Sequence, residues 1–309
     1  MPNPREIHRH MRSIGNIQQI TKAMKMVAAA RLRRAQEKAA SSRPFAEKIE
    51  SMLITALGDT TLQSKLDLSE APLMTSRSVQ KTGFIVIAGD KGLAGPYNSN
   101  VLKHALAEIT ECENYSIITV GRKAKEYFQH RGFDVAKDFF GLSDKPNFDY
   151  AEQIAKAASE MFISGEVDEV KLIYTHFKSA LSFTPETTQL LPVLVPGEKA
   201  VKISSGVSFP SDEDDEEEEE IGEVIYEPNP QTLMKELLPN YVKTLIYAAL
   251  MQSAASELGA RMTAMSSATD NASDLLRSLE LSYNKARQAG ITREINEIVG
   301  GAEALSQQN

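Results

Sequence analysis

The fold is decided by the stretch 248–286, AALMQSAASELGARMTAMSSATDNASDLLRSLELSYNKA. Its small and apolar residues recur at alternating steps of three and four, a spacing typical of the seam of a coiled coil. The stretch therefore predicts one long helix from Gln231 to about Ala289, which needs a partner helix to cover its seam. The seam residues are Ala248, Met251, Ala255, Leu258, Met262, Met265, Thr269, Ala272, Leu276, Leu279, Tyr283 and Ala286.

A partner segment with the same spacing lies at the N-terminal end of the chain, with one polar interruption at Lys25. Both seams are rich in Ala, Ser and Thr, which allows two helix backbones to approach closely. We therefore expect the two ends of the chain to pair as an intramolecular coiled coil, with a domain inserted between them. The N-terminal seam residues are Ile7, Met11, Ile14, Gln18, Thr21, Ala28, Leu32, Ala35, Ala39, Ser42, Ala46, Ile49, Leu53 and Ala56.

Both predicted helices begin with the same signals. Asn3-Pro4-Arg5-Glu6 offers an Asn N-cap, a Pro at the first helical position and a Glu placed to complete a capping box. Asn229-Pro230 repeats the first two of these signals. Gly58 is a suitable stop for the first helix, whereas Pro44 and Pro239 predict a kink or a restart within each helix.

Composition narrows the class of protein. The single cysteine, Cys112, excludes an intramolecular disulfide and is typical of a reducing compartment. No apolar run approaches the roughly 18 residues that a membrane-spanning helix needs. The N-terminal residues lack the apolar core of a secretory signal, so we expect none.

Charge is distributed unevenly along the chain. The formal net charge is −8, but nine consecutive carboxylates, Asp212 to Glu220, account for all of it. Residues 1–48 carry eleven Lys and Arg against three Glu. A basic helix and an acidic run in one chain indicate two different electrostatic surroundings. We expect the acidic run to form a solvated loop.

Between the two helical ends the hydrophobic period changes, and strand patterns alternate with helix patterns. This alternation predicts an α/β layer with a mainly parallel sheet over residues 82–210. The expected strands are 83–88, 115–120, 133–136 and 169–175, with a hairpin-like return over 182–194. The expected helices are 99–111, 122–131 and 150–164.

The loop after the first expected strand, GDKGLAGP at 89–96, invites a nucleotide-binding interpretation. Its glycines are spaced G-x-x-G-x-x-G, however, and not as the G-x-G-x-x-G of dinucleotide-binding folds. A strand-to-helix turn needs glycine for steric reasons alone, so the pattern favours a tight turn. The histidines have no partner at metal-ligand spacing, and no catalytic arrangement can be argued. The sequence therefore predicts no catalytic residue, no metal and no cofactor.

Several collinear blocks resemble the γ subunit family of F-type ATP synthases. SLELSYNKARQAGITREINEIVGGAEAL, at 278–305, resembles the family's C-terminal signature, and IQQITKAMKMVAAARLRRAQ, at 17–36, its opening helix. ARMTAMSSATDNASDLL, GDKGLAGPYNSN and YEPNP also look like family blocks. The resemblance implies the family's fold, an antiparallel coiled coil of the two termini with an inserted Rossmann-like α/β domain. The domain limits we expect are 1–58, 82–210, 211–228 and 229–309.

The resemblance also implies a function and partners. It implies a non-catalytic central rotor shaft that couples ion-driven rotation of the membrane c ring to the catalytic sites of the α and β head. The α/β domain would bind the ε subunit. The chain would lie on the cytoplasmic side of a bacterial-type cell membrane, held there through the complex.

Contact residues follow from the resemblance position by position. It implies head contacts at Lys22, Met24, Lys25, Arg261, Arg287, Gln288 and Thr292, and c-ring contacts at Val224, Tyr226 and Glu227. An arginine fork suits brief, directional hydrogen bonds to carboxylates on a passing subunit. The chain departs from the family at Ala94, where many relatives carry Cys, and in the long acidic run.

Two other functions compete with the shaft. The basic N-terminal helix is compatible with a coiled-coil protein that binds nucleic acid, although it lacks interleaved aromatic residues and a binding motif. The α/β layer is compatible with a Rossmann-type enzyme that carries helical extensions. A salt-sensitive shift of DNA or RNA would support the first, and saturable nucleotide binding by the isolated chain the second.

Overall fold

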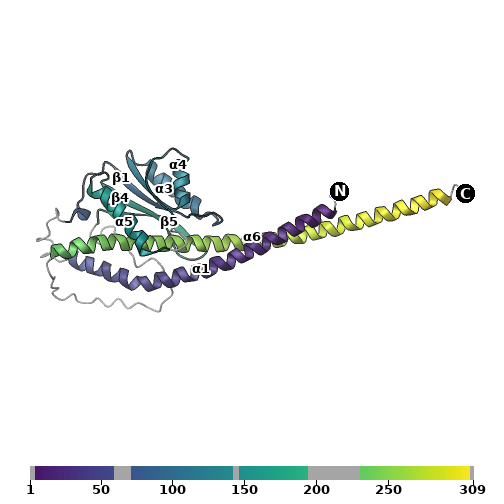
Figure 1. The fold of residues 1–309 in the computed structure, drawn as a ribbon, viewed down its shortest axis with the longest axis horizontal. Coiled ribbons are helices and arrows are strands. Elements are labelled where there is room, and N and C mark those ends of the chain that lie inside the picture. The colour runs from purple at the N-terminus through teal and green to yellow at the C-terminus, as the bar shows by residue number, and fades with distance from the viewer. Residues whose placement is uncertain (1–3, 59–70, 142–145, 194–229, 307–309) are drawn as a thin grey trace. The chain divides into compact units, whose positions relative to one another are not determined.

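Two long helices and a five-stranded sheet make up most of the computed structural model, which describes residues 4–58, 71–141, 146–193 and 230–306 (Figure 1). Helix α1 spans Pro4–Gly58 and α6 spans Pro230–Ser306. Packing divides the chain into two units, residues 1–27 with 262–309 and residues 28–261. Below, they are called the terminal unit and the domain unit. Each long helix runs through both.

The sheet of the domain unit has the strand order β3-β2-β1-β4-β5. Strands β1 (Thr82–Ile87), β2 (Tyr115–Val120), β3 (Val135–Phe139) and β4 (Glu169–Phe177) are parallel, and β5 (Phe183–Leu191) is antiparallel to β4. The predicted mainly parallel α/β sheet is thus confirmed. The connecting helices are α3 (Tyr97–Thr110), α4 (Arg122–Gln129) and α5 (Phe148–Ile163), and a short 3₁₀ turn, η2, covers Pro72–Met74.

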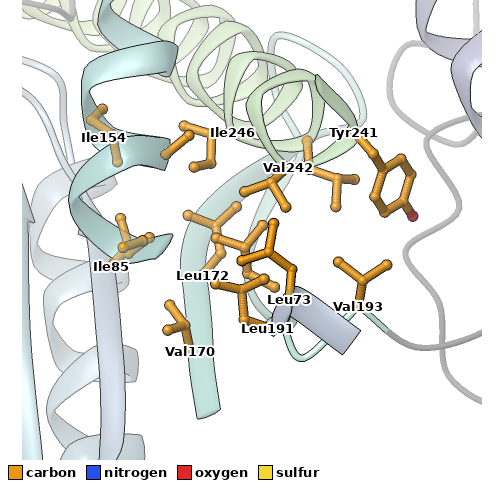
Figure 2. Packing of buried hydrophobic residues seen from close by; sticks show 14 of the residues in the cluster. Leu73, Ile85, Ile154, Val170, Leu172, Leu191, Val193, Tyr241, Val242 and Ile246 are labelled. Atoms are coloured by element: carbon orange, nitrogen blue, oxygen red, sulfur yellow. The ribbon is translucent and has the colours of Figure 1, made fainter. Parts of the chain in front are cut away.

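Alternate residues of β1 point to opposite faces of the sheet and build two cores. Phe84 and Val86 pack with α3 and α4. Ile85 and Ile87 pack with α5 and with α6, and part of α1 joins this larger core. Figure 2 shows Ile85, Leu172 and Ile246 within it. Because both faces of β1 are covered, its run TGFIVI is buried throughout, as parallel strands require.

Within the domain unit, α6 is buried on more than one face. A seam predicts a single covered stripe, yet every residue from Met251 to Ala260 is buried. The sheet contacts this helix directly, since the amide of Thr175 donates to Ser253 Oγ at 3.3 Å and Ser256 Oγ donates to the Thr175 carbonyl at 3.3 Å. Small residues on this stretch allow that close approach.

In the terminal unit, α1 and α6 pair, as the seams predict, and they run antiparallel, as the resemblance implies. Three side-chain hydrogen bonds join the helices: Gln18 to Ser273 at 2.7 Å, Thr21 to Thr269 at 2.8 Å and Lys25 to Ser266 at 2.9 Å. Residue numbers therefore decrease along α6 as they increase along α1. Lys25, the polar interruption in the seam, is therefore accommodated by a serine opposite. Hydrogen bonds across a helix seam fix its register.

Several element boundaries differ from those expected. The third strand begins at Val135, not 133, because Phe133 completes the end of α4. Its amide donates to the Phe128 carbonyl at 3.1 Å, and the two rings meet edge to face. Of the kink or restart predicted at Pro44 and Pro239, the restart is wrong, since both prolines lie inside continuous helices. Packing of buried neighbours such as Ala46 and Leu238 stabilises the helical conformation on either side of the prolines.

The long helix α6 also continues to Ser306, past the expected end near Ala289. Residues 291–300 are exposed throughout. The domain limits expected from the sequence stay predictions, because the structure does not describe residues 194–229.

Candidate interaction sites

Six of the seven residues implied as head contacts lie on the helices of the terminal unit. Five of these side chains are exposed, and Met24 is half-buried. The exposed ones are Lys22, Lys25, Arg287, Gln288 and Thr292. Lys25 also donates to Ser266, so one of its three donor positions is used inside the chain.

These six residues form two separate groups. Lys22, Met24 and Lys25 lie on α1 beside Ser266 of α6. Arg287 follows Ser266 by 21 positions on the same helix, which is about 30 Å along the helix axis at about 1.5 Å per residue. The structure therefore offers two patches on the terminal unit for a partner.

Arg261 belongs to the domain unit and has partners of its own chain. Its side chain is only 11% exposed. Nη2 lies 2.5 Å from Glu257 Oε1 and donates to the Gly92 carbonyl at 3.1 Å. Glu257 is itself 2% exposed. The implied ring contacts Val224, Tyr226 and Glu227 lie outside the described residues.

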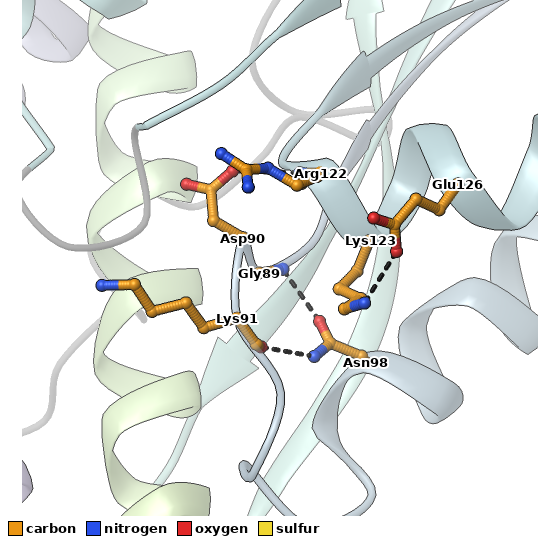
Figure 3. A network of polar contacts seen from close by, with 7 residues as sticks. All are labelled: Gly89, Asp90, Lys91, Asn98, Arg122, Lys123 and Glu126. Carbon is orange, nitrogen blue, oxygen red and sulfur yellow. Dashed lines mark hydrogen bonds and ion pairs between the residues drawn. The ribbon is translucent and has the colours of Figure 1, made fainter.

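The loop at 89–96 uses its polar groups to hold its own shape (Figure 3). The Asn98 side chain accepts from the amide of Gly89 at 2.9 Å and donates to the Lys91 carbonyl at 3.2 Å. Asp90 accepts from the amide of Arg122 at 3.0 Å, at the start of α4. These bonds hold the loop against the starts of α3 and α4.

The loop lies where doubly wound sheets bind their ligands. The strand order reverses between β1 and β4. In such folds, ligands bind in the crevice outside the carboxyl ends of the two strands at this point. Here α6 fills that place through Ser253 and Ser256. A cavity of about 10 Å³ remains, lined by Tyr97, Glu257, Ile87, Ala88, Val120, Leu250, Ser253 and Ala254. That is room for about one water molecule, far below the several hundred Å³ typical of a nucleotide-sized pocket.

Burial and the neighbouring Glu257 raise the pKa of Tyr97 well above its usual range. Tyr97 therefore stays a neutral hydroxyl packed among Ala94, Ala260 and Phe183. Tyr97 itself therefore supplies no ionised nucleophile.

Among the described residues, no group of three His, Cys, Asp or Glu is placed to hold a metal ion. In this same part of the chain, no helix has the length and apolar character that a membrane crossing requires.

Sequence reasoning missed Glu257 and its part in docking the 89–96 loop. A signal was present, because Glu257 is the one charged residue in the run MQSAASELGA at 251–260 and stands four positions before Arg261. An acid inside an otherwise small and apolar helical stretch, with an arginine at i+4, indicates a buried ion pair.

The comparisons with known proteins agree along the whole chain. The family model for ATP synthase matches residues 3–305. An ATP synthase gamma chain of Heliobacterium modesticaldum is 44% identical over 308 residues, which are 99% of this chain and 100% of the relative. The chain belongs to the ATP synthase gamma chain family. A gamma chain of Picosynechococcus sp. is 43% identical, over 99% of this chain and 100% of the relative.

Solved structures of ATP synthases share the fold. A chain from the central stalk and c-ring structure of the Tetrahymena thermophila mitochondrial enzyme matches with a TM-score of 0.58 at 25% identity, over 81% of this chain and 99% of that one. A chain from the OSCP, F1 and c-ring structure of the Euglena gracilis mitochondrial enzyme gives a TM-score of 0.64 at 18% identity, over 98% and 94%.

These findings confirm the family, the fold class and the predicted function of a central-stalk subunit of F-type ATP synthase. As a gamma chain, this protein is a subunit of a membrane-associated complex. The alternative of a nucleic-acid-binding protein has no support among these matches.

Proposed function

We propose that this gamma chain is a non-catalytic shaft that turns with the c ring inside the head of α and β subunits. Its α/β domain binds the ε subunit, and the complex holds the chain at the cytoplasmic side of the cell membrane. The observation that carries the proposal is the antiparallel pairing of α1 and α6 in the terminal unit, in a chain 44% identical to a known gamma chain over its whole length.

The physical requirement on a shaft is asymmetry. Like catalytic sites adopt different states only if a partner binds those states with different affinity. The paired helices present unlike faces, since α1 exposes Lys22 and Lys25 whereas α6 exposes Asp270 and Asp274. Turning the pair therefore passes a different surface to each subunit around it.

A reconstituted complex tests this function. The chain is co-expressed with all the other ATP synthase subunits of the same organism, and membranes are assayed for ATP-driven proton or sodium pumping. We expect pumping and ATP-driven rotation of a bead attached to the chain. Membranes with every other subunit but without this chain are the control. Equal pumping in both preparations would contradict the proposal.

We also propose that Lys22, Met24, Lys25, Arg287, Gln288, Thr292 and Arg261 contact the head, and that Val224, Tyr226 and Glu227 contact the ring. The exposed pair Arg287 and Gln288 provides the clearest test. Because neither side chain supports the fold, Arg287→Ala with Gln288→Ala should slow coupled hydrolysis without lowering the thermal midpoint of the isolated chain. Arg293→Ala, an exposed neighbour outside the set, is the matched control and should change neither quantity.

A further inference from the structure

The buried pair Glu257 and Arg261 joins α6 to the loop at 89–96, and both belong to the domain unit. Glu257 is 2% exposed, so no other subunit can reach it. Arg261 is the last residue of α6 in that unit, and its guanidinium binds Glu257 and the Gly92 carbonyl together. One side chain thus ties the helix to the tip of the loop.

Apolar contacts surround this link. Ala94 and Tyr97, at the end of the loop and the start of α3, pack against Ala260 of α6. Gly89 approaches Glu257 so closely that an added Cβ would lie 3.0 Å from the carboxyl carbon. Apolar packing resists separation but has no direction. Hydrogen bonds and ion pairs of fixed geometry add resistance to sliding.

Such resistance matters for a helix that transmits torque. Elsewhere in the domain unit, α6 is tied to the domain through Ser253 and Ser256 at Thr175, and through Lys243 at Glu152. The last of these pairs is largely exposed at Glu152, whose side chain is 54% accessible. Exposed pairs contribute little. Arg261, held by Glu257 of the same helix, instead links α6 to the domain from a largely buried position, through its bond to the Gly92 carbonyl.

We propose that Arg261 acts inside its own chain as a positioning residue for coupling. With Glu257 it fastens the 89–96 loop to α6, so that the α/β domain and the helix turn as one body. This rests on the proposed shaft function. It gives Arg261 a role that needs no contact with the head.

Glu257→Gln separates the two roles, because it removes the partner of Arg261 and leaves the arginine free to contact the head. Hydrogen exchange by mass spectrometry on the full chain reports on the loop. We expect the amides of 89–96 to exchange at least tenfold faster. In the assembled complex, we expect ions pumped per ATP hydrolysed to fall by half or more while hydrolysis continues.

Two further variants keep the test decisive if Glu257→Gln folds poorly. Arg261→Lys keeps a positive charge beside Glu257 but loses the planar fork, so it should loosen the loop without leaving a buried charge uncompensated. The double variant Glu257→Gln with Arg261→Gln replaces the ion pair by two neutral amides. It should recover part of the protection and of the pumping ratio lost in the single Glu257 variant.

Glu152→Gln is the matched control, because it breaks a link between α6 and the domain that lies away from the loop. It should leave loop exchange and the pumping ratio as in the wild type. Wild-type exchange and pumping in both Glu257→Gln and Arg261→Lys would overturn the proposal. A wild-type complex that does not pump would instead overturn the shaft function, while loop exchange in the isolated chain would still decide whether the link exists.

Discussion

Gly121 shows how closely single residues are constrained around the loop at 89–96. It follows β2 with φ at +98°, and a Cβ added there would lie 2.1 Å from the Ala88 carbonyl oxygen. That oxygen belongs to backbone and cannot move aside. We expect Gly121→Ala to lower the free energy of unfolding by about 3 kcal/mol or more. Urea unfolding followed by circular dichroism measures the loss.

Gly132 provides the matched control for Gly121. Its φ is +79°, but an added Cβ would meet nothing within 4 Å. Gly132→Ala should therefore lower the free energy of unfolding by only about 1 kcal/mol, the cost of a left-handed backbone conformation for a residue with a side chain. Equal losses in the two variants would mean that the close approach to Ala88 does not matter.

Asp168 carries a dependence of stability on pH. The amides of Gln80 and Lys81 donate to its carboxylate at 2.9 and 3.0 Å, and these bonds lower its pKa. A carboxyl whose pKa is lower in the folded state stabilises it above the unfolded pKa, and this contribution disappears as pH falls through the folded value. The thermal midpoint of Asp168→Asn should therefore lie below that of the wild type at pH 7, and the gap should narrow below about pH 4.

The exposed Asp270 serves as the control for Asp168, and Asp270→Asn should produce no gap that narrows in this way. A gap between wild type and Asp168→Asn that stays constant from pH 7 to pH 3 would contradict the assignment.

Individual seam residues could be predicted from the sequence, and the spacing of Glu257 and Arg261 indicates an ion pair, whereas the loop that covers this pair could not be predicted. The spacing of three and four can be read from the local sequence alone. The N-terminal seam positions that it predicts are all buried or half-buried. Glu257 is different, since its burial depends on a loop more than 160 positions away that supplies the Gly92 carbonyl. Long-range partners of this kind leave no periodic trace.

At the scale of elements, the paired helices of the terminal unit are most sensitive where they are most buried. Met265 and Ala272 are 5% and 7% exposed, whereas Leu276 and Leu279 are half-buried. Placing two carboxylates at Met265 and Ala272 should cost about 3 kcal/mol or more, because both positions are buried in the seam. We expect the double Asp variant to lose helical signal and to be cleaved by trypsin within residues 1–27.

Leu275 lies off the seam and is 46% exposed, so Leu275→Asp is the control for the seam variant. It should keep the wild-type helical signal and resistance to trypsin. Comparable cleavage of the two variants would show that the seam is assigned to the wrong face of α6.

Element types followed the hydrophobic period, while element ends depended on local bonds. The strand at 115–120 matched its prediction residue for residue. The start of β3 did not, because Phe133 is used to close α4. The sequence pattern also did not predict that α1 continues through Pro44. Proline predicts a break in a helix, and only the packing of the neighbouring turns overrides it.

At the scale of the whole molecule, the end of α6 carries an apolar face that the described chain leaves exposed. Ile291, Ile295, Ile298 and Val299 are between 49% and 72% exposed and fall on one side of the helix by their spacing of four, three and one. An exposed apolar stripe of this kind marks a surface for a partner. Under the shaft function, that partner is the head.

Replacing these four residues by serine should separate folding from assembly. Because the side chains are exposed in the isolated chain, its thermal midpoint should change by no more than a degree or two, within the effect of about 0.5 kcal/mol typical of surface changes. Co-purification with the α and β subunits should fall severalfold, since the stripe loses its apolar contact. Glu294→Gln with Glu297→Gln, on the same exposed stretch, is the matched control and should assemble normally. Normal assembly of the serine variant would mean that the head is held elsewhere on the chain.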